Sequence, residues 1–287
     1  MKKSKKLYHT YKMVTPIFTR YLYFKNEVVN SLHWSMLEKQ YDESLYWIYE
    51  LYFSGFQEET FSLMDKFYVM YSQEIYPQYG NFIEKLYQEW KLNKVNHCII
   101  GTILKLLLES NVSLTNMLRI QQNIHINNPI DDTIFDTIRL NPVEIHKYHT
   151  LKLTKNMRNW NFLNRVACKY YVRRITCDEM SISYPFIETI DFDNWLYYAS
   201  YTPIWNRRII KYNGVIDHET KSVSIENDEF SKNYDYEPDE QSRELKKMLW
   251  SNDIEHYEKI TPSVFCSKYG GDNVYRKINI IISRSIV

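Results

Sequence analysis

The stretch that decides the fold is YDESLYWIYELYFSGF, residues 41–56. Its apolar residues recur at three- and four-residue steps, which is the spacing of one face of an α-helix. Asp42 is a candidate cap for the start of this helix, and Gly55 suits the position just after its end. The apolar face consists of Leu45, Ile48, Tyr49 and Tyr52.

Similar patterns extend outward from this stretch, over residues 27 to about 110. They predict five amphipathic helices with short connections, none of which can bury its apolar face alone. We therefore expect a mainly α protein with a HEAT-like helical-hairpin array in its N-terminal half. The expected regions are a basic, aromatic N-terminal arm (1–26), the helical array (27–125), a helical connector with a basic helix (126–190) and a mixed C-terminal region (191–287).

The C-terminal region has a different pattern. Asn213-Gly214 is a turn signal, and the residues after it alternate apolar with polar from Val215 to Ile225. This alternation predicts a small β-hairpin. We therefore expect the smaller C-terminal part to be α+β.

Bulk composition excludes several classes of protein. The 287 residues carry 36 basic and 35 acidic side chains, so net charge selects no partner. The four cysteines have no paired spacing, and no apolar run approaches the length of a membrane span. His146 and His149 are three residues apart, but we interpret them as a solvated pair because no further ligand lies nearby. With no nucleophile, phosphate-binding or metal motif, we expect no catalytic residues, no cofactor and no membrane partner.

The strongest local charge signal lies between Lys147 and Cys177, which contains no Asp or Glu and several interleaved aromatic residues. Basic side chains can neutralise phosphates while aromatic rings stack on unpaired bases, as in proteins that bind single-stranded RNA. The alternative is a solvated basic face that docks against the acidic stretch 226–240. The candidate RNA-binding residues are Arg158, Arg165, Lys169, Arg173 and Arg174.

A second candidate site is a docking motif within the opening helix. Tyr46, Leu51 and Tyr52 form a loose version of a peptide motif that docks as a helix in an apolar groove of the cap-binding translation factor. The alternative is a core helix, which we favour because apolar residues surround most of its circumference. In that case the partner site shifts to the aromatic run from Trp195 to Trp205, beside Arg207 and Arg208.

Three blocks of sequence resemble a protein family of giant, mimivirus-like DNA viruses that infect protists. They are the opening stretch, NWLYYASYTPIWNRRIIKYNGVIDHE at residues 194–219, and YDYEPDEQ at residues 234–241. The resemblance implies a setting in the cytoplasm of an infected host cell, or in the virion, with viral or host proteins as partners. It implies no catalytic chemistry.

These observations predict a non-catalytic helical scaffold or adaptor in a giant-virus multiprotein complex. Its most specific version is a translation-initiation middle scaffold that links cap-binding and helicase partners. One alternative is a virion-associated structural protein. The other is a single-stranded RNA-binding protein that uses the basic segment.

Overall fold

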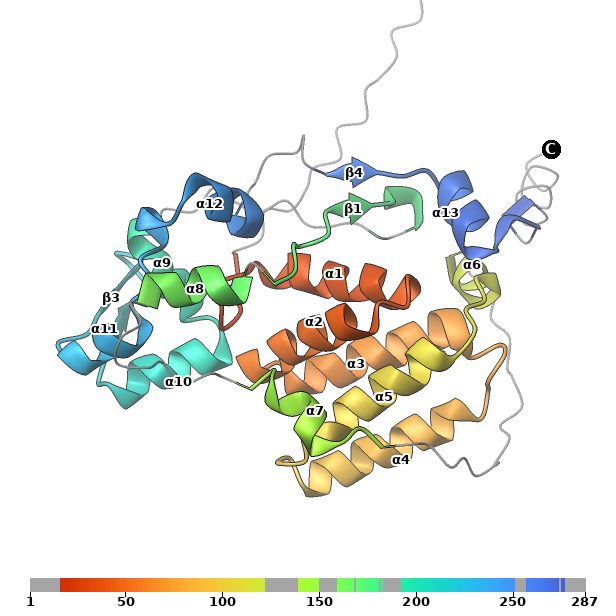
Figure 1. Ribbon diagram of the computed structural model, residues 1–287, viewed down its shortest axis with the longest axis horizontal. Coiled ribbons are helices and arrows are strands. Elements are labelled where there is room, and N and C mark those ends of the chain that lie inside the picture. The colour runs from red at the N-terminus through yellow and green to blue at the C-terminus, as the bar shows by residue number, and fades with distance from the viewer. Residues whose placement is uncertain are drawn as a thin grey trace, which may run out of the picture.

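The computed structural model shows a mainly α-helical protein with two small pairs of strands (Figure 1). This confirms the predicted α-helical class with a minor β component. The structure describes residues 16–121, 139–149, 159–167, 169–180, 182, 192–250, 257–273 and 275–276.

The N-terminal half forms a stack of helices that pack side by side, in the spatial order α1, α2, α3, α5 and α4 (Figure 1). All five predicted helices are present, because each has an apolar face that only a neighbouring helix can cover. A π-helical turn, η1, extends α3, and there the amide of Gln73 donates to the carbonyl of Tyr68 over 2.9 Å. The bounds are α1 Lys25–Leu37, α2 Tyr41–Ser54, α3 Gln57–Phe67, η1 Tyr68–Ser72, α4 Tyr79–Leu92 and α5 Cys98–Glu109.

The prediction for the C-terminal end of α2 is confirmed, and the prediction for its N-terminal end is wrong. Gly55 follows the helix in the left-handed region, with φ 102°, as expected for a C-terminal glycine. The predicted Asp42 cap is wrong, because the helix begins at Tyr41 and the cap position falls on Gln40, which makes no side-chain cap. Asp42 lies in the first turn instead, where its carboxylate accepts a hydrogen bond from Lys147 Nζ over 2.9 Å.

Residues 16–24 lie at the centre of the molecule and tie its two halves together. The indole nitrogen of Trp205 donates to the carbonyl of Thr19 over 3.0 Å, and that of Trp250 donates to the carbonyl of Leu22 over 2.7 Å. The sequence predicts that these residues belong to the N-terminal arm, residues 1–26. Their backbone instead accepts hydrogen bonds from tryptophans about 190 to 230 positions later, because both indoles need a buried acceptor.

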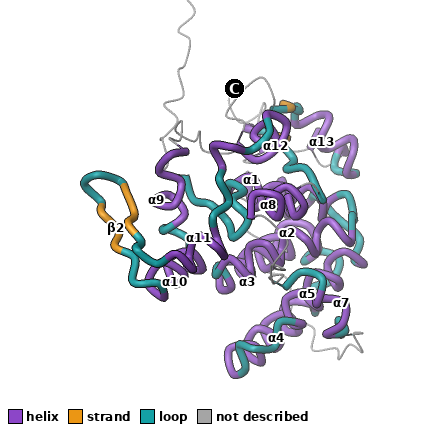
Figure 2. Tube along the Cα trace, turned by 60° about the vertical axis from the view of Figure 1, so that its left-hand side comes forward, coloured by secondary structure: helices purple, strands orange, loops and turns teal. Residues whose placement is uncertain are grey.

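A second group of helices, α8 to α12, gathers at the left of Figure 1. It contains the predicted hairpin, in which β2 and β3 are antiparallel and Ile216 is opposite Val223. Figure 2 shows this hairpin projecting away from the helices. The bounds are α8 Asn159–Ala167, η3 Phe192–Asn194, α9 Trp195–Ala199, α10 Pro203–Lys211, β2 Val215–Asp217, β3 Ser222–Ser224, α11 Asp228–Tyr234, η4 Pro238–Glu240 and α12 Arg243–Trp250.

Another strand pair was not predicted. β1 is parallel to β4, with Ile175 opposite Glu258. Strands of two residues are too short to show an alternating pattern in a sequence, so only the fold reveals them. The remaining elements are α6 Thr115–Gln121, α7 Pro142–His146, β1 Ile175–Thr176, η2 Asp178–Met180, β4 Glu258–Lys259 and α13 Pro262–Tyr269.

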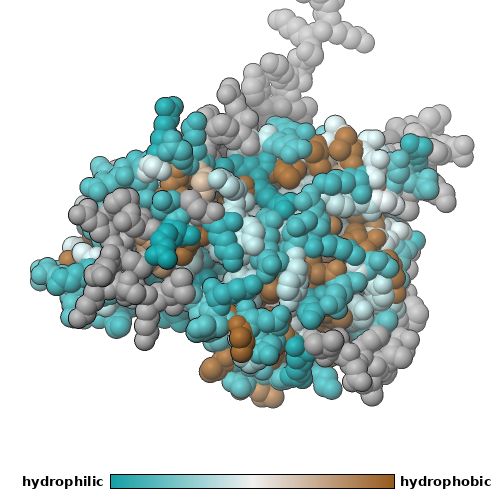
Figure 3. All heavy atoms as spheres, viewed as in Figure 1, coloured by the Kyte–Doolittle hydropathy of each residue, from teal (hydrophilic) through white to brown (hydrophobic). Residues whose placement is uncertain are grey.

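One face of the molecule shows how polar and apolar residues are distributed on the surface. Figure 3 shows hydrophilic residues over most of the visible face, with apolar residues in separate patches. Among the helices that the structure describes, none is long and apolar enough to cross a lipid bilayer.

Candidate functional site around Arg208

The proposed docking residues of α2 lie in the core. Tyr46 is 6% exposed, and Leu51 and Tyr52 are each 1% exposed. The Tyr46 hydroxyl donates to the carbonyl of Val166 over 2.6 Å, while that of Tyr52 accepts from the indole of Trp90 over 2.7 Å. A docking anchor must be accessible in the free protein. The burial therefore corrects the docking interpretation and matches the core-helix alternative.

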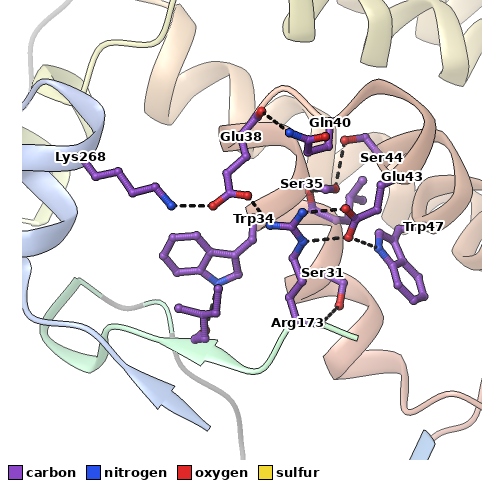
Figure 4. Close-up of polar contacts among 12 residues, drawn as sticks. Ser31, Trp34, Ser35, Glu38, Gln40, Glu43, Ser44, Trp47, Arg173 and Lys268 are labelled. Atoms are coloured by element: carbon purple, nitrogen blue, oxygen red, sulfur yellow. Dashed lines mark hydrogen bonds and ion pairs between the residues drawn. The ribbon is translucent and has the colours of Figure 1, made fainter. Parts of the chain in front are cut away.

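Two of the candidate RNA-binding arginines are held in ion pairs within the chain. Figure 4 shows the first of them, Arg173, between Glu38 and Glu43. Arg173 Nη1 lies 2.5 Å from Glu38 Oε2, and its Nη2 lies 2.6 Å from Glu43 Oε2. Arg174 Nε lies 2.7 Å from the almost fully buried carboxylate of Glu27. These carboxylates belong to α1, α2 and the turn between them, not to the acidic stretch 226–240 that the sequence offers as a partner. Paired in this way, neither arginine can neutralise a phosphate without losing its carboxylate.

Of the other three candidate RNA-binding residues, two lie in the described chain. Arg165 and Lys169 are exposed, and Arg158 lies outside the described residues. Partial burial lowers the pKa of Lys169, and the nearby positive charge of Lys147 lowers it further. The structure therefore brings together fewer free positive charges than the sequence predicted.

The second predicted partner region, on α9 and α10, is divided between the core and the surface. Pro203 begins α10, where its fixed φ suits the first helical turn. Trp205 and Arg208 are three positions apart and share the inner face of the helix; Trp205 is fully buried and Arg208 is 7% exposed. Arg207 is exposed on the outer face, and Trp195 is half-buried against Trp205.

Three aromatic rings, from α9, α11 and the loop after α11, lie against Trp205 on the inner face of α10. Trp195 and Trp205 meet edge to face with centroids 5.2 Å apart. Tyr236 stacks on Trp195 at 6.4 Å and meets Trp205 edge to face at 5.4 Å. Tyr234 meets Trp205 at 5.9 Å. We call this group, with the guanidinium of Arg208, the Arg208 site.

The guanidinium of Arg208 has aromatic neighbours but no counter-charge. Its Cζ lies 4.4 Å from the ring centre of Trp205 and 4.6 Å from that of Tyr234, which are cation–π distances. Its Nη1 is buried and has no hydrogen-bond partner. Within the described part of the chain, the guanidinium forms no ion pair. A buried charge with no opposite charge is unfavourable, so this arrangement requires an explanation.

A second buried arginine shows how this chain usually satisfies such a charge. Arg20 Nε donates to Glu50 Oε2 over 2.8 Å, and Arg20 Nη2 donates to the carbonyl of Tyr148 over 2.7 Å. The other carboxylate oxygen of Glu50 accepts from the amide of Tyr21 over 3.1 Å. Arg20 thus has a carboxylate partner in the core, and Arg208 has none, although the Nη1 of Arg20 also lacks a hydrogen-bond partner.

The phenol of Tyr236 does not supply the missing negative charge. Burial raises the pKa of Tyr236, although the nearby charge of Arg208 opposes this shift, so the phenol stays neutral at ordinary pH. The turn after it is strained, since Glu237 precedes Pro238 and has φ 42°, which costs about 1 kcal/mol or more in a residue with a side chain. Gln241 Nε2 secures this turn by donating to the carbonyl of Tyr236 over 2.7 Å.

Sequence reasoning missed Tyr234 and Tyr236 because we interpreted their segment as an acidic stretch. The available signal was the block YDYEPDEQ, in which two tyrosines alternate with acids. In the fold, this block meets the aromatic run of α9 and α10. The opening stretch also reaches α10, where a Cβ added to Gly55 would lie only 2.5 Å from Pro203 Cβ. Residues 41–56, 194–219 and 234–241 therefore come together around α10.

The predicted histidine pair shows no metal-site geometry. The ring centroids of His146 and His149 are 6.2 Å apart. The ring centroid of His97 lies 5.4 Å from that of His149. In the described ranges, no three His, Cys, Asp or Glu side chains are placed to hold one metal ion.

No known protein family, curated protein or solved structure matches this chain. The candidate site is therefore defined by its residues and their geometry.

Proposed function

We propose that the protein is a non-catalytic helical scaffold or adaptor that binds a protein partner through the outer face of α10. One observation carries this proposal: α10 is anchored on one side and exposes a mixed apolar and basic surface on the other. Ile210 is 62% exposed, and Arg207 and Lys211 flank it on the surface. Arginine and apolar side chains are typical of the centres of protein interfaces.

The inner side of α10 supports this role by fixing the helix in place. The Thr202 hydroxyl, just before the helix, donates to the carbonyl of Phe18, and Trp205 donates to Thr19. A rigid support lowers the entropy that a surface loses when it binds. Two further exposed apolar residues, Tyr201 and Val215, flank α10 in the sequence.

The finer versions of the proposal rest on sequence patterns and on the viral resemblance. In one, the stack α1–α5 is a HEAT-like hairpin array in a giant-virus complex in the host cytoplasm. In the other, the protein is a translation-initiation middle scaffold bound to viral or host initiation factors. The burial of Tyr46 and Leu51 removes the docking motif that suggested this second version, so its remaining support is the helical stack.

The alternatives differ in the partners they require. A virion-associated structural protein would use the same α10 surface against capsid proteins. Direct RNA binding is disfavoured because Arg173 and Arg174 are engaged with carboxylates of α1 and α2. We keep the structural protein as the second candidate.

A pulldown with two matched variants tests the proposal. Ile210→Asp places a charge at the centre of the α10 surface, and Leu92→Asp does the same at an exposed leucine on α4. Both sites are on the surface, so folding stability should change by no more than about 0.5 kcal/mol. Mass spectrometry of the complexes from producing cells should show a protein partner that Ile210→Asp loses and Leu92→Asp retains.

The identity of the partner separates the versions. Initiation factors would support the translational scaffold, and capsid proteins would support the structural alternative. If both variants retain every partner, the α10 surface is not the binding face and the proposal fails.

A further inference from the structure

The thiols of Cys177 and Cys266 are both enclosed in the core. Their side chains are 1% and 0% exposed, and neither is bonded to another cysteine. Their positions in the sequence do not suggest a pair, because about 90 residues separate them. The fold changes this, since it brings together the two segments that carry them.

Cys177 and Cys266 follow two strands that lie side by side. β1 and β4 are parallel, and the amide of Ile260 donates to the carbonyl of Thr176 over 2.9 Å. Cys177 comes directly after Thr176, and Ile260 leads into α13, the helix that carries Cys266 (Figure 1). The two cysteines therefore leave the same strand pair, one in the turn after β1 and the other in the second turn of α13.

Both segments also pack against the buried indole of Trp34. Its Nε1 donates to the carbonyl of Ile175 over 2.9 Å, and its ring centroid lies 5.8 Å from that of Phe265. Ile175 lies two positions before Cys177, and Phe265 directly precedes Cys266. One side chain of α1 thus holds the neighbours of both thiols in place.

The two thiols are close enough to interact electrostatically through the core. Burial first, and then the nearby charges of Asp272 and Cys177, raise the pKa of the Cys266 thiol to about 11. Burial also raises the pKa of the Cys177 thiol to about 11. An effect of one sulfur on the other falls with their separation, so it indicates that the two side chains are neighbours.

We propose that Cys177 and Cys266 form a disulfide bond in an oxidising environment and thereby fasten α13 to the segment after β1. Disulfides persist in extracellular compartments and at virion surfaces, and are rare in a reducing cytoplasm. The bond would therefore close when the protein leaves a reducing cytoplasm. This inference does not rest on the proposed α10 surface.

The oxidant is a low-molecular-weight disulfide such as glutathione disulfide. The thiolate of one cysteine attacks a sulfur of glutathione disulfide, forms a mixed disulfide and releases one glutathione thiolate. The thiolate of the other cysteine then attacks the protein sulfur of the mixed disulfide and releases the second glutathione. The two protein thiols lose two protons and two electrons, and glutathione disulfide becomes two molecules of reduced glutathione.

Burial makes this exchange slow in the folded protein. Glutathione cannot reach the enclosed sulfurs until α13 separates from its neighbours, and the raised pKa of each thiol leaves little reactive thiolate at neutral pH. The experiment therefore oxidises the chain while it refolds, when both thiols are accessible.

The full chain is unfolded in urea with its cysteines reduced, and is then refolded in a buffer of reduced glutathione and glutathione disulfide. A second sample is never unfolded and stays in the same buffer until its number of free thiols is constant. Mass spectrometry of peptides that are cut without reduction shows which cysteines are joined. The variants are Cys177→Ala and Cys266→Ala. The matched controls are Cys98→Ala, at a partly exposed free cysteine, and Cys168→Ala, at a cysteine outside the described residues.

A peptide pair that joins Cys177 to Cys266 should be the main product in the wild-type protein and in both controls. A bond that closes a loop of about 90 residues restricts the unfolded chain, so the oxidised protein should melt about 5 to 15 °C above the reduced protein. This difference should disappear in Cys177→Ala and Cys266→Ala. Each variant is compared with its own reduced form, so any loss of stability from the substitution itself cancels.

Three results would overturn the inference. The first is a native circular dichroism spectrum in either sample with both cysteines still present as thiols or bound to glutathione. The second is a main product that joins either cysteine to Cys98 or Cys168. The third is a bonded protein that melts no higher than the reduced one.

Discussion

Removing one member of the buried Arg20–Glu50 pair should destabilise the protein far more than removing one member of an exposed pair. Both side chains are at most 2% exposed, and the guanidinium and carboxylate are 2.8 Å apart. Glu50→Leu removes the acceptor of Arg20 and also that of the Tyr21 amide. A hydrogen bond to a charged group contributes about 1.5 to 3 kcal/mol, so the loss of two gives about 3 to 6 kcal/mol.

The matched control is the exposed pair between Arg139 and Glu89. Its contact is bidentate, unlike that of Arg20 with Glu50, with distances of 2.8 and 3.0 Å, and its side chains are 60% and 38% exposed. Glu89→Leu should therefore cost no more than about 1 kcal/mol, because water replaces the lost partner. Urea denaturation followed by circular dichroism measures both free energies of unfolding, and the m-values show whether the transitions remain comparable.

The double variant Arg20→Met/Glu50→Leu distinguishes two free energies. One is the destabilisation caused by a buried charge without a partner, and the other is the net contribution of the ion pair to stability. The double variant should be more stable than Glu50→Leu alone, because no unpaired charge stays in the core. Equal losses for Glu50→Leu and Glu89→Leu would refute the reasoning. So would a double variant as unstable as the single one.

Three further predictions concern the core. Leu51→Ala should lower the free energy of unfolding by about 2 to 5 kcal/mol in the same denaturation assay. A loss under about 0.5 kcal/mol would indicate that the Leu51 side chain is exposed and contradict the prediction. Burial lowers the pKa of His33 to about 4, below its ordinary 6.5, so the unfolded state binds more protons between these values. The free energy of unfolding should fall by up to about 3 kcal/mol as pH drops from about 6.5 to 4. If this free energy falls no more steeply with pH in the wild-type protein than in His33→Gln, the prediction is contradicted. Gly55→Ala should cost more than Gly270→Ala, since both have positive φ but only Gly55 lacks room for a Cβ, which would lie 2.5 Å from Pro203 Cβ. Thermal melts that rank the two variants the other way would count against the close packing of α2 and α10.

The sequence was sufficient for the features that depend on neighbouring residues. The five N-terminal helices follow from apolar residues at helical spacing, and Gly55 follows from the need for positive φ after a helix. The hairpin follows from alternation after Asn213-Gly214. The core position of α2 could also be predicted, because apolar residues on most of its circumference leave little surface for solvent.

The candidate site could be predicted only in part. The sequence pointed to the run from Trp195 to Arg208, and the structure packs Trp195, Trp205 and Arg208 of this run together. It could not show that Arg208 lies inside and Arg207 outside, since this depends on which face of α10 the rest of the protein covers. It also did not indicate Tyr234 and Tyr236, whose role depends on a turn that brings them back to α10.

Tertiary structure alone decided which charges remain available to a partner. Arg174 meets Glu27 across 147 positions of the chain, and Arg173 meets Glu43 across 130. Local periodicity carries no information about such pairs, because they form only when distant helices pack and exclude water from the charges. For the same reason the sequence shows a continuous basic segment, whereas the fold neutralises two of its arginines and leaves Arg208 buried without a carboxylate.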